Sequence, residues 1–207
     1  MIYYASRTGT RRNLAAFAAH GWRVLVSARG VLRTEGFPYA LDNGAWTSYV
    51  RGEPFDEAAF TAAVDLLGAG ADWIVCPDVV MGGLDSLAMS LRWLDYVLAH
   101  GKMALIPVQN GMTAADIAPH IGPRVGIFVG GDDAFKEETM AGWAKLARSR
   151  GAYCHVGRVN TRGRIRLCLD ACADSADGSS GSRFAVNVPR IDGWARQTSL
   201  ISLVNRG

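Results

Sequence analysis

Short apolar runs recur along the chain, and each is bounded by glycine, proline or polar residues. We expect six strands at residues 2–6, 22–27, 39–41, 72–76, 103–108 and 125–129. A seventh strand is expected to end at His155-Val156-Gly157-Arg158, and an eighth at Asp177-Gly178-Ser179-Ser180. Runs that are apolar at almost every position are typical of a parallel sheet that is buried on both faces.

Helical patterns separate most of these runs. Helices are expected at residues 13–19, 84–99 and 136–148, and from a cap at Asp56 to a stop signal at Gly68. Thr113 caps a shorter helix, and a short basic helix separates the last two strands. Eight strands joined in this way predict an α/β fold, a compact (β/α)8 TIM barrel formed by residues 1–207 as one domain, rather than an open doubly wound sheet. The chain has no glycine-rich dinucleotide fingerprint after its first strand and no GxxxxGK[ST] motif.

Composition excludes several classes of protein. With 49% hydrophobic and 20% charged residues among 207, the chain is too apolar to be disordered. No apolar run reaches the roughly 18 residues of a membrane span, and the N-terminus lacks the order of a signal peptide, so we expect a cytoplasmic protein without a membrane partner. The four cysteines form no CxxC pair and no zinc-type cluster, so no metal site is expected.

The charge is unevenly distributed although its net value is only +3. Residues 1–40 carry six Arg and one acid, residues 41–100 carry nine acids and two Arg, and residues 145–207 carry eleven basic and four acidic side chains. The two ends would form one basic face if the fold brings them together. Nineteen of the 22 basic residues are Arg, which suits phosphate contacts, although a compositional bias of the genome is an alternative explanation.

Polar residues stand at the carboxyl ends of most predicted strands. They are Asp42, Asp78, Gln109, Gly130-Gly131, His155-Gly157-Arg158 and Asp177. Since the carboxyl ends of parallel strands converge on one mouth of a barrel, we expect these groups to share a pocket. Each position taken alone is also compatible with an ordinary turn. Carboxylates suit substitution at an anomeric carbon, and a carboxylate with an amide and backbone N–H groups suits binding of a purine edge.

Six short motifs then occur in an order that resembles a known family. They are LDNGAW (41–46), WIVCPD (73–78), PVQNG (107–111), FVGGD (128–132), HVGRVNT (155–161) and ADSADGSSGSR (173–183). This series resembles the successive motifs of tRNA-guanine transglycosylases, and it looks closer still to their DNA-directed relatives in phages and bacteria, which exchange guanine for 7-deazaguanine bases. The match spans residues 39–183.

The resemblance implies a role for each matching residue. Asp177 corresponds to the nucleophile that forms a covalent glycosyl intermediate, and Asp42 to the aspartate assigned to proton transfer and base contact. Asp78 and Gln109 correspond to residues that bind the heterocycle, with Gly130 and Gly131 closing over it. Trp46, beside Asp42, is a candidate for base stacking. No cofactor is implied apart from a 7-deazaguanine base, such as preQ0, as co-substrate.

Departures from the family pattern favour DNA over tRNA. Asn43 and Ala45 replace a Ser and a Gly of the first motif, and Gly178-Ser179-Ser180 replaces a Pro-Thr-Arg segment. The cysteine-rich zinc subdomain of the tRNA enzymes is missing. A smaller barrel that contacts the DNA backbone is therefore expected, through Arg158, Arg162, Arg164, Arg166 and Arg183.

Several alternatives stay open at this point. His155 is equally compatible with the core and with the site, Asp174 with a cap, and the three arginines of residues 162–166 with a solvated helix face. Other tryptophans, among them Trp73, Trp93 and Trp143, are expected in the core. A DNA glycosylase that removes a modified base, or a non-catalytic barrel that binds nucleic acid, also fits the sequence. The sequence is also compatible with a homo-oligomer or with a partner protein.

Overall fold

The chain closes into a ring of eight parallel strands. In this computed structural model, residues 1–197 are described. Each strand pairs with the next one in the sequence, and the last pairs with the first, which closes the barrel. The strands are β1 (Ile2–Ser6), β2 (Arg23–Ser27), β3 (Tyr39–Asp42), β4 (Ile74–Val75), β5 (Ala104–Val108), β6 (Val125–Val129), β7 (Cys154–Val156) and β8 (Ser175–Gly178).

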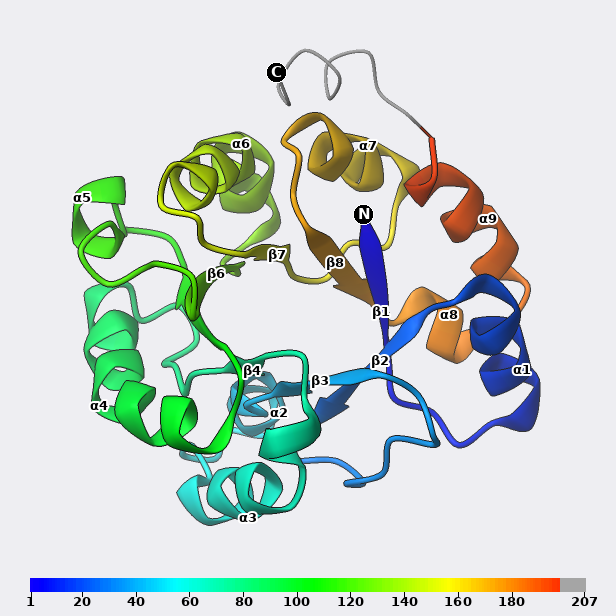
Figure 1. The fold of residues 1–207 in the computed structure, drawn as a ribbon, viewed down its shortest axis with the longest axis horizontal. Coiled ribbons are helices and arrows are strands. Elements are labelled where there is room, and N and C mark those ends of the chain that lie inside the picture. Colours follow the sequence, from blue (N-terminus) through cyan, green and yellow to red (C-terminus); the bar gives the residue numbers. More distant parts are fainter. Residues whose placement is uncertain (198–207) are drawn as a thin grey trace.

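Helices follow the strands and surround the ring (Figure 1). They are α1 (Arg11–His20), α2 (Ala45–Val50), α3 (Glu57–Leu67), the 3-10 helix η1 (Gly68–Gly70), α4 (Leu84–His100), α5 (Ala114–Ile117), α6 (Asp133–Ser149), α7 (Arg162–Asp170), α8 (Ser180–Arg183) and α9 (Asn187–Ala195). This arrangement confirms the predicted (β/α)8 barrel. Among residues 1–197, no helix combines the length and hydropathy that a membrane span requires.

Side-chain caps fix where several helices begin. Asp56 accepts a hydrogen bond from the backbone N–H of Ala59, which confirms it as the cap of α3. Asp132 accepts one from Phe135 in the same way, so α6 begins at Asp133, ahead of the predicted start at residue 136. Such caps satisfy N–H groups that have no partner within the helix.

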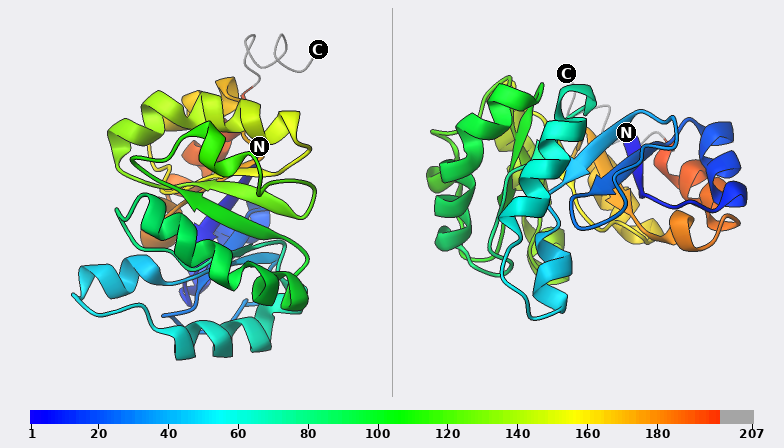
Figure 2. Two further views of the ribbon diagram at one scale, coloured as in Figure 1. Left: turned by 90° about the vertical axis from the view of Figure 1, so that its left-hand side faces the viewer. Right: turned by 90° about the horizontal axis from the view of Figure 1, so that it is seen from below.

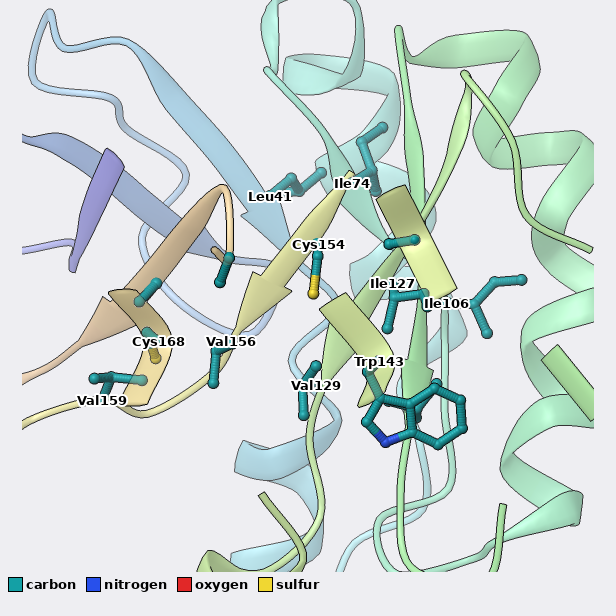
Figure 3. Packing of buried hydrophobic residues seen from close by; sticks show 14 of the residues in the cluster. Leu41, Ile74, Ile106, Ile127, Val129, Trp143, Cys154, Val156, Val159 and Cys168 are labelled. Atoms are coloured by element: carbon teal, nitrogen blue, oxygen red, sulfur yellow. The ribbon is translucent and has the colours of Figure 1, made fainter. Parts of the chain in front are cut away.

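Alternate residues of each strand face the barrel interior or the surrounding helices. The interior layer contains the buried residues Tyr4, Ala40, Trp73, Val75 and Leu105. The larger layer lies between strands and helices, where residues such as Leu41, Ile106 and Trp143 pack together (Figure 3). Trp73 and Trp143 are buried and Trp93 packs against the core, as expected from the sequence.

The same alternation determines which polar residues reach the mouth of the barrel. Asp42 stands two positions after the interior residue Ala40, and Gln109 four positions after Leu105. Asp177 is opposite Tyr4 in the register of β8 and β1, and Asp42 is opposite Ser27 in that of β3 and β2. The chemical groups therefore continue the stack of interior side chains.

Some local predictions were wrong. Asp42 is the last residue of β3 rather than, as predicted, the first residue after it. The predicted strand at residues 72–76 is paired only over Ile74–Val75. Three helices, α2, α8 and α9, were not predicted, and α2 projects at one end of the barrel (Figure 2).

Candidate active site

One cavity of about 220 Å³ opens at the carboxyl ends of the strands. It brings together residues from β3, β8 and the segments that follow β3 to β7, although they are far apart in the sequence. Nine of the candidate site residues from the sequence line it: Asp42, Trp46, Asp78, Gln109, Gly130, Gly131, Gly157, Arg158 and Asp177. His155, expected in the same pocket, is not among the lining residues. The shared pocket expected from the strand ends is therefore present.

Two side-chain amides hold the carboxylate of Asp78. Asn43 Nδ2 donates to Asp78 Oδ1 at 2.7 Å, and Gln109 Nε2 donates to Oδ2 at 2.5 Å. Asn43 Nδ2 also donates to the carbonyl of Cys76, and Gln109 Nε2 also donates to the hydroxyl of Ser86. These contacts fix both the carboxylate and the amides in one orientation.

The side-chain oxygen of Gln109, Oε1, is a buried hydrogen-bond acceptor that no described residue uses. Gln109 is only 3% exposed, and Oε1 has no hydrogen-bond partner within residues 1–197. An unsatisfied buried acceptor costs about 1–3 kcal/mol, so it is a feature to be expected where a ligand supplies the missing donor. The position of Gln109 in the cavity wall fits that explanation.

Burial raises the pKa of Asp78 to about 7. The hydrogen bond from Asn43 opposes this shift, the nearby charge of Asp42 adds to it, and the bond from Gln109 opposes it. The pKa of Asp42 is raised to about 6, also chiefly by burial, and the charge of Asp177 contributes. The hydrogen bond from Gly44 N to Asp42 Oδ2, at 3.1 Å, acts in the opposite direction. Asp42 and Asp78 therefore both titrate close to neutral pH, well above the usual range of an aspartate.

The carboxylate of Asp177 is held on one oxygen only. His155 Nε2 lies 3.0 Å from Asp177 Oδ1, and the backbone N–H of Arg158 donates to the same oxygen at 3.2 Å. The other ring nitrogen, His155 Nδ1, lies 2.7 Å from Ser175 Oγ. If Ser175 donates to Nδ1, Nε2 carries the proton that Asp177 accepts. No residue within 1–197 makes a hydrogen bond to Asp177 Oδ2.

Aromatic rings immobilise His155. It is fully buried, with ring centroids of Trp73, Phe128 and Tyr4 at 4.6, 5.0 and 5.8 Å. The structure thus confirms His155 as a packed core residue, and its ring also contacts Asp177, which lines the cavity.

Lys136 is a site residue that the sequence analysis missed. It lines the cavity and is only 2% exposed, with Nζ donating to the carbonyl of Gly157 at 3.3 Å and pairing with Asp133 at 3.2 Å. Burial lowers the pKa of Lys136, and the pairing with Asp133 opposes that shift. Its position in an ordinary amphipathic helix pattern gave no signal of this role.

The rim of the cavity presents an aromatic and cationic pair. The guanidinium of Arg158 lies 4.1 Å from the ring centroid of Trp46, which is 46% exposed. Arg158 has a positive φ of 61°, a conformation that is uncommon outside glycine and that aims its N–H at Asp177. Arg158 therefore contacts both the rim, through its side chain, and the carboxylate of Asp177, through its backbone N–H.

The other predicted DNA-contacting arginines do not line the cavity. Arg162 is exposed at the start of α7, and Arg183 is exposed on α8. Arg164 pairs with Asp133 and Glu137, and Arg166 pairs with Asp170. Neutralised side chains of this kind contribute less to binding of a polyanion than Arg162 and Arg183, for which no ion pair is seen within residues 1–197. Asp174 precedes β8, and its carboxylate accepts from the backbone N–H of Cys154 at the start of β7, a contact between neighbouring strands rather than the expected cap.

The two basic ends of the chain lie side by side. β1 pairs with β8, and Asn13 Nδ2 donates to the carbonyls of Gly181 and Ser182. The fold thus brings α1, which begins with Arg11 and Arg12, next to α8, which ends with Arg183. This proximity is the condition stated above for one basic face.

Comparisons with known proteins show the fold and nothing more specific. No known protein-family model and no curated protein matches the sequence. Among solved structures, the chain is similar to a 4-hydroxy-2-oxoglutarate/2-dehydro-3-deoxyphosphogluconate aldolase, with a TM-score of 0.55 and 10% sequence identity over 93% of this chain and 94% of the aldolase. Within residues 1–197, no group of three or more His, Cys, Asp or Glu side chains is arranged to hold a metal ion.

Proposed function

We propose that this chain is a DNA-guanine transglycosylase that exchanges guanine for a free 7-deazaguanine base. The observation that carries the proposal is the opposition of two differently held carboxylates across one cavity. Asp78 follows β4 and is clamped by amides, whereas Asp177 lies on β8 and keeps Oδ2 without a partner among the described residues. In a closed ring of eight strands, β4 and β8 face each other.

The clamped side of the cavity suits a guanine-like heterocycle. Guanine N1–H and its exocyclic amine are adjacent donors, and a carboxylate accepts both. Asp78 is the carboxylate available for this contact, and Gln109 Oε1 beside it is a further acceptor without a partner among the described residues. A 7-deazaguanine presents the same pair of donors, so one site accommodates the leaving and the incoming base.

The opposite side supplies the chemistry of glycosyl transfer. Asp177 Oδ2 attacks C1′ of the nucleotide, the C1′–N9 bond breaks, and its electron pair passes to guanine N9, which takes a proton from Asp42. The incoming base then gives its N9 proton to Asp42 and attacks C1′, which releases the carboxylate of Asp177. The raised pKa of Asp42 suits a group that both donates and accepts this proton.

DNA is proposed as the substrate because of the rim of the cavity. The site lies inside the mouth of the barrel, so a base within a duplex must leave the stack to reach Asp78. Trp46 offers an exposed ring for stacking, and Arg158 a cation beside it. The arginines on α1, α7 and α8 lie on elements around this mouth.

A titration with 7-cyano-7-deazaguanine tests the base site. We expect saturable binding to the wild-type protein and about 10- to 100-fold weaker binding to Asp78→Asn, since hydrogen bonds to a charged acceptor contribute about 1.5–3 kcal/mol. Asp85→Asn is the matched control, because Asp85 is an exposed carboxylate at the start of α4. Equal affinities in the two variants would contradict the assignment of Asp78.

The products of a reaction with DNA then separate exchange from hydrolysis. A transglycosylase replaces guanine by the added base and leaves the strand intact. A glycosylase that uses water to resolve the intermediate leaves an abasic site instead. Mass spectrometry of an oligonucleotide after incubation distinguishes the two outcomes.

A further inference from the structure

A second cavity, which we term the side lobe, adjoins the first at Asp42. It has a volume of about 210 Å³ and is lined by Arg7, Ser27 and Gly30, together with Ser6 and Asp42, which also line the main cavity. Its walls come from the carboxyl ends of β1, β2 and β3, and nothing described above assigns it a role.

One polar atom at the side lobe lacks a partner. Arg7 Nε is buried and makes no hydrogen bond within residues 1–197. Ser27 Oγ is also buried, and its hydrogen bond to the carboxyl of Asp42 lowers the pKa of that group, although no partner of normal geometry lies within the described residues. A buried donor without an acceptor is costly to leave unsatisfied, which indicates that an acceptor from outside completes Arg7 Nε.

Arg7 shares its nearest acid with a second arginine. One of its terminal nitrogens pairs with Glu35, which lies 3.7 Å from Arg33 as well. Two guanidinium groups thus share one carboxylate. Burial raises the pKa of Asp42, the other acid at the side lobe, to about 6, so this carboxyl is mostly neutral below pH 6 and mostly ionised at pH 7.

The position of the side lobe matches the path of a nucleotide across the barrel. The groups proposed to bind the base follow β4, β5 and β6, and the proposed nucleophile lies on β8. In the closed ring, β1 and β2 lie across from β5 and β6, and β1 is the neighbour of β8. With the base on Asp78 and C1′ at Asp177, the sugar-phosphate extends away from the base towards β1 and β2.

We propose that the side lobe binds a phosphate group of the target nucleotide, with Arg7 and Ser27 as donors. This inference rests on the proposed function, since it takes the base site as the origin of the nucleotide's path. A phosphate oxygen supplies the acceptor that Arg7 Nε lacks, and the Ser27 hydroxyl turns from Asp42 to a second phosphate oxygen. The side lobe then distinguishes a nucleotide within a strand from a free base or nucleoside.

Calorimetric titrations with guanine, 2′-deoxyguanosine and its 5′- and 3′-monophosphates test the proposal. With the wild-type protein, one of the two monophosphates is expected to bind about tenfold or more tightly than the nucleoside. This advantage is expected to disappear in Arg7→Gln and to shrink in Ser27→Ala, while the affinity for guanine stays unchanged. Arg33→Gln is the control, because Arg33 contacts the same Glu35 but its side chain is 70% exposed and does not line the lobe.

The outcomes distinguish this inference from the proposed function. If the wild-type protein binds guanine but gains nothing from either phosphate, or if both Arg7→Gln and Ser27→Ala keep the full gain, the phosphate site is refuted while the base site stands. If guanine itself does not bind, both are refuted. Thermal unfolding of each variant confirms that it is folded, and Ser27→Ala alone decides the result if Arg7→Gln is unstable.

Discussion

His155 Nε2 lies 3.0 Å from Asp177 Oδ1, and the histidine that makes this contact is completely enclosed by the barrel. Ser175 fixes the other ring nitrogen, so both nitrogens of the imidazole are occupied. One oxygen of Asp177 is therefore held, and the other remains for chemistry in the cavity. In the proposed reaction this geometry suits His155 to a positioning role, and it distinguishes Asp177 from Asp42 and Asp78.

Replacement of His155 tests that role. His155→Leu removes the donor to Asp177 and is expected to slow formation of the protein-DNA adduct about 100-fold, because small misplacements of a reacting group have effects of that size. His155→Gln retains a side-chain N–H and is expected to recover much of the rate. Single-turnover adduct formation and the affinity for 7-cyano-7-deazaguanine are measured together. A purely structural role predicts equal losses in both variants, together with weaker binding of the base.

Gly130→Ala tests whether the base occupies the space beside β6. A Cβ at Gly130 would meet only ordinary contacts, with the nearest atom, Val108 O, at 3.4 Å, so the variant is expected to fold normally. The added methyl group narrows the cavity, and we expect about tenfold weaker binding of the base, in keeping with a cost of about 1–3 kcal/mol for overpacking. Gly131, by contrast, has a positive φ of 75°, and a Cβ added there would lie 2.7 Å from Asn110 Oδ1, so Gly131→Ala is expected to lower stability. Unchanged base affinity in a folded Gly130→Ala protein would count against this placement.

Base binding is expected to strengthen as the pH rises. The pKa of Asp78 is about 7, and only its ionised form accepts two hydrogen bonds from the base. Affinity should increase between pH 5.5 and 8, by up to about tenfold per unit below the pKa, and level off above it. Asp42 titrates in the same range, so the contribution of Asp78 is the part of the slope that disappears in Asp78→Asn. A slope that survives in that variant would assign the proton to another group.

The free energy of unfolding is expected to fall between pH 4 and pH 7 because of the buried carboxyl group of Asp78. Because the pKa of Asp78 is higher in the folded protein than in the unfolded chain, the fold favours its protonated form. That stabilisation is fully present below about pH 4 and is lost as the pH rises to about 7. Asp78→Asn carries no titrating group there, and a rotated Gln109 amide can accept from the new amide. Urea unfolding should therefore show the variant gaining stability relative to the wild type from pH 4 to pH 7, whereas a constant difference would contradict the shift.

Much of the site could be predicted because parallel strands impose a simple geometry. Apolar runs separated by helical patterns indicate a barrel, and polar residues at the ends of those runs must then converge. Asp42, Asp78, Gln109 and Asp177 meet in one cavity for that reason. The inward direction of each side chain follows from the two-residue period of a strand.

Other parts depend on packing that a sequence does not display. Lys136 is buried and donates to the carbonyl of Gly157, a contact that arises only once α6 is packed against the barrel. α9 contains Pro189 and Gly193, which disfavour a helix, and it is stabilised by burial of Val188 and Ile191 instead. Ser86 reaches Gln109 from α4, a contact that arises only once the helix is packed against the barrel.

The most direct test is the mass of a guanine-containing oligonucleotide after incubation with the protein and 7-cyano-7-deazaguanine. The account predicts that the wild-type protein replaces guanine by the added base in an intact strand, and that Asp177→Ala neither makes this product nor forms a covalent protein-DNA adduct. An unchanged oligonucleotide with the folded wild-type protein, or full exchange by Asp177→Ala, would contradict it.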